Sequence, residues 1–269
     1  MFVISKLKGF TLFELVIVIL LLGILAISLS KISLFSVSGY VDAKDRHSLG
    51  SSTKFITEII SRNLRESLPQ SIRVGNSGSI YCVEYIHVEN ASTLIDFNNA
   101  IPLDNIQVAE FDVASSAAQY VVVMPITTNE LYSTNLGVIT AFSGFSVNSG
   151  IATINLPAPY KFKYLPPQNR IFLTNSPSSF CLDDNTGQLY SYKNYPMVAS
   201  QPFPPTGGSI SLMAENLAAS GTVFTYQPGN LHRSGLFQMS FEIFNRSKNQ
   251  SLGVESFQLF HEVHIRNVP

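Results

Sequence analysis

The chain has 269 residues, a formal net charge of −1 and only 13% charged residues. Because it has no surplus of basic residues, its composition argues against nucleic acid as a partner. Tyr and Phe are plentiful while Trp is absent, a mixture that suits a β-rich domain outside the cytoplasm.

A short basic leader opens the chain and a long apolar run follows it. Lys6 and Lys8 precede Gly9, and the apolar run extends from Phe10 to Leu29. As a helix, this run would span roughly 30 Å, the thickness of one hydrocarbon core. The lysines of the leader predict a cytoplasmic N-terminus, so we expect the rest of the chain outside the membrane.

A single acid, Glu14, interrupts the apolar run. A charge at the centre of a membrane helix costs about 2.5–3.5 kcal/mol, and less near an end, so such a residue is typical of a functional position. A secretory signal peptide would need a small-residue cleavage site after the apolar run, and none is present. An ordinary signal anchor would explain the lysines and the apolar run, but neither the Gly9–Phe10 junction nor Glu14.

The segment GFTLFELVIVILLLGILA, residues 9–26, resembles the class III signal of type IV prepilins and type II secretion pseudopilins. Phe13 is a slight departure, because the family prefers an aliphatic residue there. The resemblance implies that a prepilin peptidase cuts after Gly9, removing leader residues 1–9, and that Phe10 is then N-methylated. It also implies that Glu14 sets the assembly register by pairing with the N-terminal amine of a neighbouring subunit.

The pattern beyond the apolar run predicts that one helix continues from about Thr11 to Leu68, because no proline occurs before Pro69. We expect a transmembrane and assembly half over 10–35 and an amphipathic half over 36–68 that packs on a sheet. Gly50 is a potential bend. The apolar stripe recurs at helical spacing and consists of Leu49, Ile56, Ile59, Ile60, Leu64 and Leu68. Opposite charges four residues apart follow the other face, at Lys54–Glu58, Glu58–Arg62 and Arg62–Glu66.

Short alternating runs between turn residues predict an antiparallel β-rich globular domain over residues 69–269. The expected fold class is therefore α+β, with a long N-terminal helix packed on a C-terminal antiparallel β-rich domain. The expected strands are Ile80–Val88, Tyr120–Met124, Val138–Phe142, Ile151–Leu156, Arg170–Leu173, Ser179–Leu182, Gln188–Tyr192, Val223–Gln227, Leu236–Phe244 and Val254–Ile265.

Turn chemistry predicts how several of these strands are connected. Asp184–Gly187 is expected to form a hairpin turn. Residues 194–208, which contain four prolines, are expected to form an exposed loop. Met213–Ala219 is expected as a short helix or turn. The last two strands are expected to form a terminal hairpin whose turn lies near Asn245–Gln250.

The chain has two cysteines, Cys82 and Cys181. In an oxidising periplasm two cysteines usually pair, so we expect a disulfide, the alternative being two buried free thiols. The bridge would close a loop of about 100 residues and stabilise the fold by up to roughly 4.7 kcal/mol in the chain-entropy model.

No catalytic motif is present: the sequence lacks a nucleophile elbow, a P-loop, H-E-x-x-H and a dinucleotide-binding glycine pattern, so we expect no enzyme and no cofactor. His261 and His264 would point to opposite faces of a strand, a poor geometry for a metal. Asp183–Asn185 could offer oxygens to calcium, although turn chemistry explains them more simply. The aromatics Tyr190, Tyr192, Tyr195 and Phe203 could form a partner surface or be ordinary strand and loop residues.

Further segments resemble minor pilins of the MSHA (mannose-sensitive haemagglutinin) pilus, and the architecture is similar to pseudopilin J of type II secretion. They read YVDAKDR, ISRNLRESLPQSIRV, CLDDNTGQLYSYKNY and HEVHIRNVP. Many major pilins have proline where this chain has Lys31, so its absence favours a minor subunit. The resemblance implies a single-pass inner-membrane protein with a periplasmic domain, which reaches the pilus tip after assembly. Its implied partners are prepilin peptidase, other minor and major pilins and the inner-membrane assembly platform.

Three alternatives come from other classes. The β-domain could be a tip adhesin, which a further domain would favour, although about 200 residues leave little room for one. The chain could instead serve a type II secretion pseudopilus, which the N-terminal motif does not separate from a pilus. A membrane-tethered enzyme would need the catalytic motifs that are missing.

Overall fold

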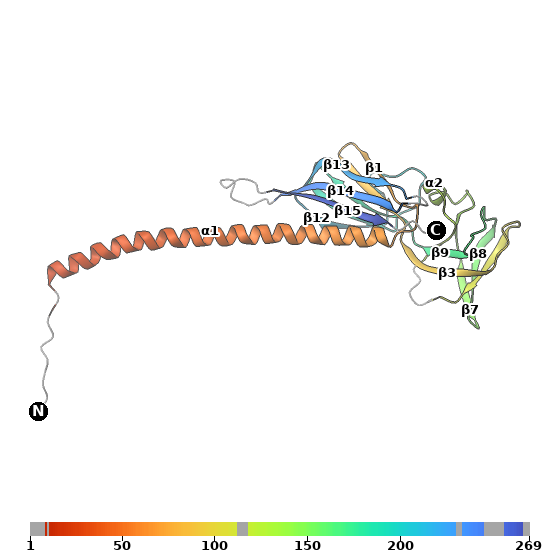
Figure 1. The fold of residues 1–269 in the computed structure, drawn as a ribbon, viewed down its shortest axis with the longest axis horizontal. Helices are drawn as coiled ribbons and strands as arrows, with labels where there is room; N and C mark the ends of the chain where they lie inside the picture. The colour runs from red at the N-terminus through yellow and green to blue at the C-terminus, as the bar shows by residue number, and fades with distance from the viewer. Residues whose placement is uncertain (1–8, 10, 112–117, 230–232, 245–255, 266–269) are drawn as a thin grey trace, which may run out of the picture. The chain divides into compact units, whose positions relative to one another are not determined.

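The structure, a computed structural model, describes residues 9, 11–111, 118–229, 233–244 and 256–265 (Figure 1). The chain divides into two compact units, Met1–Gly50 and Ser51–Pro269, which are considered one at a time. Helix α1 (Leu12–Arg65) begins in the first unit and ends in the second. A β-rich domain follows it, in which all strand pairs among the described residues are antiparallel, so the predicted α+β class is confirmed.

The part of α1 after Gly50 carries the apolar stripe that the sequence predicts. Ile56, Ile60 and Leu64 are fully buried, while Arg62 and Glu58 form an ion pair of 3.1 Å on the solvent side. This division between a buried and a charged face is the one that a helix packed on a protein core requires.

The helix ends at Arg65 and not at the predicted Leu68. The reason lies in the backbone, because the amide of Leu68 donates to the carbonyl of Ile86 over 2.8 Å, and Ser67 forms a β-bridge with His87. These residues therefore pair with a strand connection, although Leu68 remains fully buried.

A five-stranded antiparallel sheet lies beside this part of the helix. Its spatial order is β1 (Arg73–Ser77), β2 (Ile80–Tyr85), β10 (Ser178–Asp183), β11 (Gln188–Lys193) and β12 (Ser209–Ala214). The hydroxyl of Tyr85 donates to Oδ1 of Asn63 over 3.0 Å, which joins the sheet to the helix. The opposite face of the sheet carries Cys82 and Glu84, which alternate with Tyr85 along β2. It is covered by residues 194–208, called the covering loop below, in which Tyr195 donates to Glu84 and Gln201 to the carbonyl of Cys82.

The end of the chain forms a three-stranded sheet of β13 (Leu217–Gln227), β14 (Gly235–Phe244) and β15 (Ser256–Ile265). Strand β14 alternates strictly between buried and half-buried residues, the pattern of a strand with one face on a core. The register of β14 with β15 runs from Gly235–Ile265 to Phe244–Ser256, as the predicted terminal hairpin requires. Its turn near Asn245–Gln250 lies outside the described residues.

Residues 88–174 form a separate seven-stranded sheet, called the inserted lobe below because it interrupts the chain between β2 and β10. The spatial order is β6 (Ile139–Ala141), β5 (Tyr120–Val123), β9 (Arg170–Thr174), β3 (Val88–Asp96), β4 (Leu103–Ala109), β8 (Ile151–Tyr160) and β7 (Gly144–Asn148). A short helix, α2 (Thr128–Leu131), lies between β5 and β6. Figure 1 shows β3, β7, β8 and β9 gathered in this lobe.

The inserted lobe has its own hydrophobic core. Buried side chains from β3, β4, β5, β8 and β9 meet there, among them Val108, Val121, Ile154 and Leu173. The sheet curls, as a contact between strands far apart in its order shows. The hydroxyl of Tyr160 at the end of β8 donates to the carbonyl oxygen of Ile139 in β6 over 2.8 Å. A second cluster, which includes Leu68, Ile86, Tyr132 and Phe172, packs the lobe against the segment that follows α1.

The expected strands are all found, with changed bounds, but several elements are missing from the prediction. The expected strand Ile80–Val88 is two strands, because the chain leaves one sheet after Tyr85 and enters another at Val88. The expected helix or turn at Met213–Ala219 is wrong, because these residues end β12 and begin β13. The predicted hairpin turn at Asp184–Gly187 is confirmed. The elements that the prediction missed are β1, β3, β4, β7, β12 and α2.

Cys82 and Cys181 lie opposite each other in the paired strands β2 and β10 and form a disulfide. They are 99 residues apart, so the whole inserted lobe lies within the loop that the bond closes. The disulfide therefore restrains the two chain segments that lead into and out of the lobe.

We expect the Cys82→Ala/Cys181→Ala variant to lose about 2–5 kcal/mol of unfolding free energy, because its unfolded chain is no longer cross-linked. The measurement is urea unfolding of the full chain in detergent, followed by circular dichroism. A reductant should destabilise the wild type by a similar amount and leave the variant unchanged. Equal stability of the oxidised wild type and the variant would contradict the expectation.

Candidate functional site

The N-terminal motif contains a hydrogen-bonded cap at the start of α1. Thr11 precedes the first helical residue, and its hydroxyl accepts a hydrogen bond of 3.3 Å from the amide of Glu14. In return, Oε2 of Glu14 accepts bonds from the amide and the hydroxyl of Thr11, at 3.1 and 3.2 Å. This reciprocal arrangement is a capping box, which satisfies amides that the first helical turn leaves unpaired. The carboxylate of Glu14 is thus fixed at the helix start and is exposed to solvent.

Gly9, on the other side of the predicted cleavage point, is exposed and lies before the helix. A Cβ added to Gly9 would meet no other atom within 4 Å. Phe10, the predicted methylation site, lies outside the described residues. The junction therefore gives no folding reason for a glycine at position 9.

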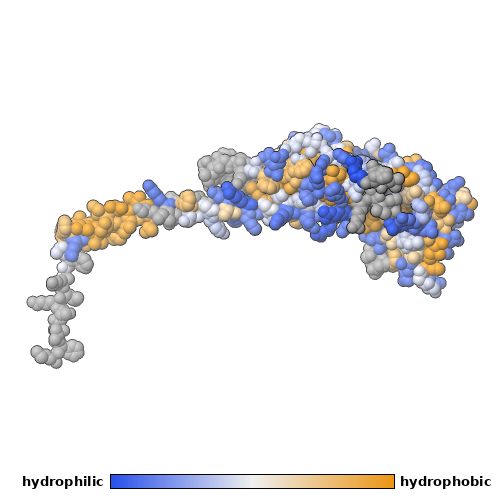
Figure 2. All heavy atoms as spheres, in the orientation of Figure 1, coloured by the Kyte–Doolittle hydropathy of each residue, from blue (hydrophilic) through white to orange (hydrophobic). Residues whose placement is uncertain are grey.

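The first half of α1 presents large apolar side chains on all sides, as Figure 2 shows on the face it displays. Leu15, Leu20 and Leu25 are each more than half exposed. By length and composition α1 is the one helix among the described residues that is able to cross a membrane. Such a surface needs an apolar environment, either lipid or the helices of other subunits.

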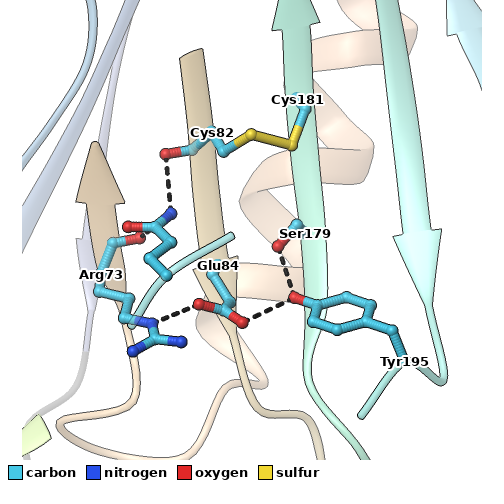
Figure 3. Close-up of a disulfide and its surroundings, with 7 residues drawn as sticks. Arg73, Cys82, Glu84, Ser179, Cys181 and Tyr195 are labelled. Carbon is cyan, nitrogen blue, oxygen red and sulfur yellow. Dashed lines mark hydrogen bonds and ion pairs between the residues drawn. A yellow bond between two sulfur atoms is a disulfide. The ribbon is translucent and has the colours of Figure 1, made fainter. Parts of the chain in front are cut away.

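A second cluster of sequence-predicted residues lies between the five-stranded sheet and the covering loop (Figure 3). The disulfide, Tyr192 and Tyr195 are buried together there, with Tyr190 and Phe203 partly buried at the edge. These four aromatics are therefore side chains of a small core and do not form an exposed partner surface. Phe203 packs directly on β1, because a Cβ at Gly75 would lie 2.7 Å from its ring.

The cluster contains a fully buried carboxylate, Glu84, which the sequence analysis did not single out. Nε of Arg73 on the neighbouring strand β1 forms an ion pair with Oε2 of Glu84, and the hydroxyl of Tyr195 donates to Oε1 over 2.8 Å. Burial raises the pKa of Glu84, while Arg73 and Tyr195 oppose that rise. Burial also raises the pKa of Tyr195 far above its ordinary value, so this hydroxyl keeps its proton and remains a donor.

Arg73 joins three separate parts of the domain. Besides Glu84, its guanidinium donates to the backbone carbonyls of Val198 and Ala199 in the covering loop, at 2.9 and 2.6 Å. It also lies 3.6 Å from the ring centre of Tyr132, at the end of α2 in the inserted lobe. The planar fork of arginine can make these contacts at once, which a lysine cannot. The sequence feature that could have identified Glu84 is its position as an acid within the apolar strand IYCVEY, two residues after Cys82.

The other candidate residues serve ordinary structure. Asp183 and Asp184 accept hydrogen bonds from the amides of Asn185 and Ala219, at 3.0 and 2.6 Å, so turn chemistry occupies their carboxylates. His261 and His264 are three residues apart in β15 and point to opposite faces. Within the described residues, no group of three or more His, Cys, Asp or Glu side chains has the arrangement of a metal site.

Comparison with known proteins finds one relation, at the N-terminus. A family model for the prokaryotic N-terminal methylation motif matches residues 4–30. No curated protein and no solved structure matches the chain. The motif covers Gly9, Phe10 and Glu14, and it supports a type IV pilin-like protein with a structural role. Together with the apolar half of α1, it is compatible with a single-pass membrane anchor.

We expect Arg73→Met to lower the unfolding free energy by about 3–5 kcal/mol, because Glu84 would stay buried without a cationic partner. The double variant Arg73→Met/Glu84→Met should recover much of that loss. Urea unfolding followed by tyrosine fluorescence measures both, since the chain has 11 tyrosines and no tryptophan. Additive effects in this double-mutant cycle would show that the pair is not coupled.

Proposed function

We propose that this protein is a minor type IV pilin of the MSHA type, similar to the MSHA pilus biogenesis protein MshO. It is cut by prepilin peptidase after Gly9, N-methylated at Phe10, and helps prime or cap pilus assembly from the inner membrane. The observation that carries the proposal is the methylation motif over residues 4–30, continuous with an apolar helix whose side chains are exposed. Its partners are the peptidase, other minor and major pilins and the assembly platform.

The capping box supports a specific route to assembly. Before cleavage, Glu14 and Thr11 satisfy each other at the helix start. Cleavage after Gly9 creates a free amine at Phe10, and the amine of a neighbouring subunit pairs with Glu14. This cationic partner stabilises the carboxylate when apolar helices surround it in the fibre. The apolar half of α1 holds the subunit in the inner membrane until then, with the β-rich domain in the periplasm.

A second candidate function is that of a pilus-tip subunit that contacts a surface. The inserted lobe favours it, because residues 88–174 add a sheet with its own core to the strands that pack beside α1. A third candidate is a minor pseudopilin of a type II secretion system. The N-terminal motif fits a pilus and a secretion system equally.

Gly9→Ala should block cleavage and leave a precursor that is nine residues longer than the mature chain. The fold should be unaffected, since an added Cβ at this position meets nothing within 4 Å. Immunoblotting of membranes with and without the prepilin peptidase measures the difference in mobility. Normal maturation of the variant would show that Gly9 is not the processing site.

Cells that lack only this protein should have few or no surface pili, even with the retraction motor disabled, and electron microscopy counts them. Complementation with wild type should restore pili, whereas Glu14→Ala should not. Glu14→Gln is the matched variant, because glutamine keeps the capping box but removes the charge.

If neither Glu14→Ala nor Glu14→Gln restores pili, the result supports pairing of the Glu14 carboxylate with the amine of a neighbouring subunit. Full function of Glu14→Gln would show that Glu14 acts only as a helix cap. Normal pilus numbers in the deletion strain, with loss of adhesion, would replace the priming role by the tip role.

A further inference from the structure

The covering loop lies over the disulfide (Figure 3). Both cysteines are buried, with Cys82 exposed by 0% and Cys181 by 2%. They share the face of the sheet that carries Glu84, and the other face carries Tyr85 and packs beside α1. A thiol in solution therefore reaches the disulfide from the side of the covering loop.

Beside Cys82, the cover of the disulfide consists of side chains of the loop. Gly75 lies opposite Cys82 on the neighbouring strand β1 and offers no side chain to cover it. The ring of Phe203 fills the space over Gly75, because a Cβ there would lie 2.7 Å from the ring. Nε2 of Gln201 donates to the carbonyl of Cys82 over 3.3 Å. Displacement of Phe203 and Gln201 thus uncovers the disulfide at this end.

This part of the covering loop is held by weaker contacts than the residue that precedes it. The structure describes all of residues 196–204, called the lid below, and none of them is buried. Arg73 donates to two carbonyls of the lid, and Gln201 of the lid donates to two carbonyls of the sheet. Tyr195, by contrast, is buried and bonded to Glu84. Segments with few buried contacts open locally at a lower free energy than the core.

We propose that the lid opens in the folded protein and that a dithiol then reduces the Cys82–Cys181 bond. A thiolate of the dithiol attacks one sulfur and forms a mixed disulfide, while the other cysteine leaves as a thiolate. The second thiol of the reagent then displaces the first cysteine. The dithiol becomes a disulfide, and the two protons that it loses end on the two cysteine thiols.

Reduction releases a restraint at the base of the inserted lobe. Strand β2 leads into the lobe and β10 leads out of it, and the bond joins these two strands. Arg73, which holds the lid, also stacks on Tyr132 of the lobe. The lid and the disulfide therefore form a redox switch for the attachment of the lobe. The proposal does not rest on the role in pilus assembly.

The test measures the rate at which dithiothreitol reduces the disulfide of the full chain in detergent, with the free thiols counted by alkylation and mass spectrometry. For the wild type, this rate should change less than about twofold between no urea and about 1 M urea, because opening of the lid exposes little surface. Reduction through global unfolding would accelerate at least about fivefold over that range.

Gln201→Ala and Phe203→Ala should each accelerate reduction about tenfold, because each removes contacts that hold the lid closed. Ile60→Val is the matched control, because Ile60 is a fully buried residue of α1, which packs beside the other face of the sheet. It lowers the global stability, which would accelerate reduction through global unfolding about fivefold, but it should leave reduction through the lid unchanged. Circular dichroism should show that all three variants are folded.

Three results would overturn the proposal. They are a wild-type rate that rises with urea as steeply as unfolding does, lid variants that are reduced no faster than the wild type, and equal acceleration by Ile60→Val and the lid variants. Each would show that the disulfide is reduced only in the unfolded chain. The readout needs no pili, so this failure is separable from failure of the proposed function.

Discussion

The arrangement of the β-rich domain depends on the contacts of one group, the guanidinium of Arg73. It pairs with the fully buried Glu84, holds two carbonyls of the covering loop, and stacks on Tyr132 of the inserted lobe. A charge taken out of water is stable only when its partner stays in place. Movement of the covering loop removes two carbonyl acceptors from Arg73, and movement of the inserted lobe removes the ring of Tyr132 from it. The partner of the buried Glu84 thus couples three segments that are distant in the sequence.

The two halves of α1 differ in how their apolar side chains are covered. At its start, Thr11 and Glu14 satisfy each other, and the following apolar turns find no cover within the first unit. After Gly50, the stripe of Ile56, Ile60 and Leu64 is fully buried within the second unit. The first half is thus long and apolar enough to cross a membrane, and the second half is an ordinary core helix, although both are helical.

Elements that depend on neighbouring residues in the sequence were predictable, and elements that depend on contacts with distant residues were not. The helix, the Asp184–Gly187 turn and most strands follow from periodicity and turn residues. Strand β1, RVGNS, was missed because glycine, asparagine and serine occupy positions where the pattern needs apolar alternation. Strand β12, SISLMA, was missed although Ser209–Leu212 alternate, because it is short and mostly exposed and is defined by its pairing with β11. The same holds for Glu84, since nothing local reveals that Arg73, eleven residues away, faces it across the strand pair. The prediction also treated the β-rich region as one body and did not separate residues 88–174.

The strands that bracket the inserted lobe are direct neighbours, with Tyr85 opposite Ser178. The lobe thus leaves and rejoins the sheet at nearly one point, as an exchangeable module does. This geometry allows a change in the size of the module without displacement of β2 and β10, provided that the contact of Tyr132 with Arg73 is kept. Variation among relatives should then concentrate between β2 and β10, and a foreign domain with adjacent termini has a natural grafting point there.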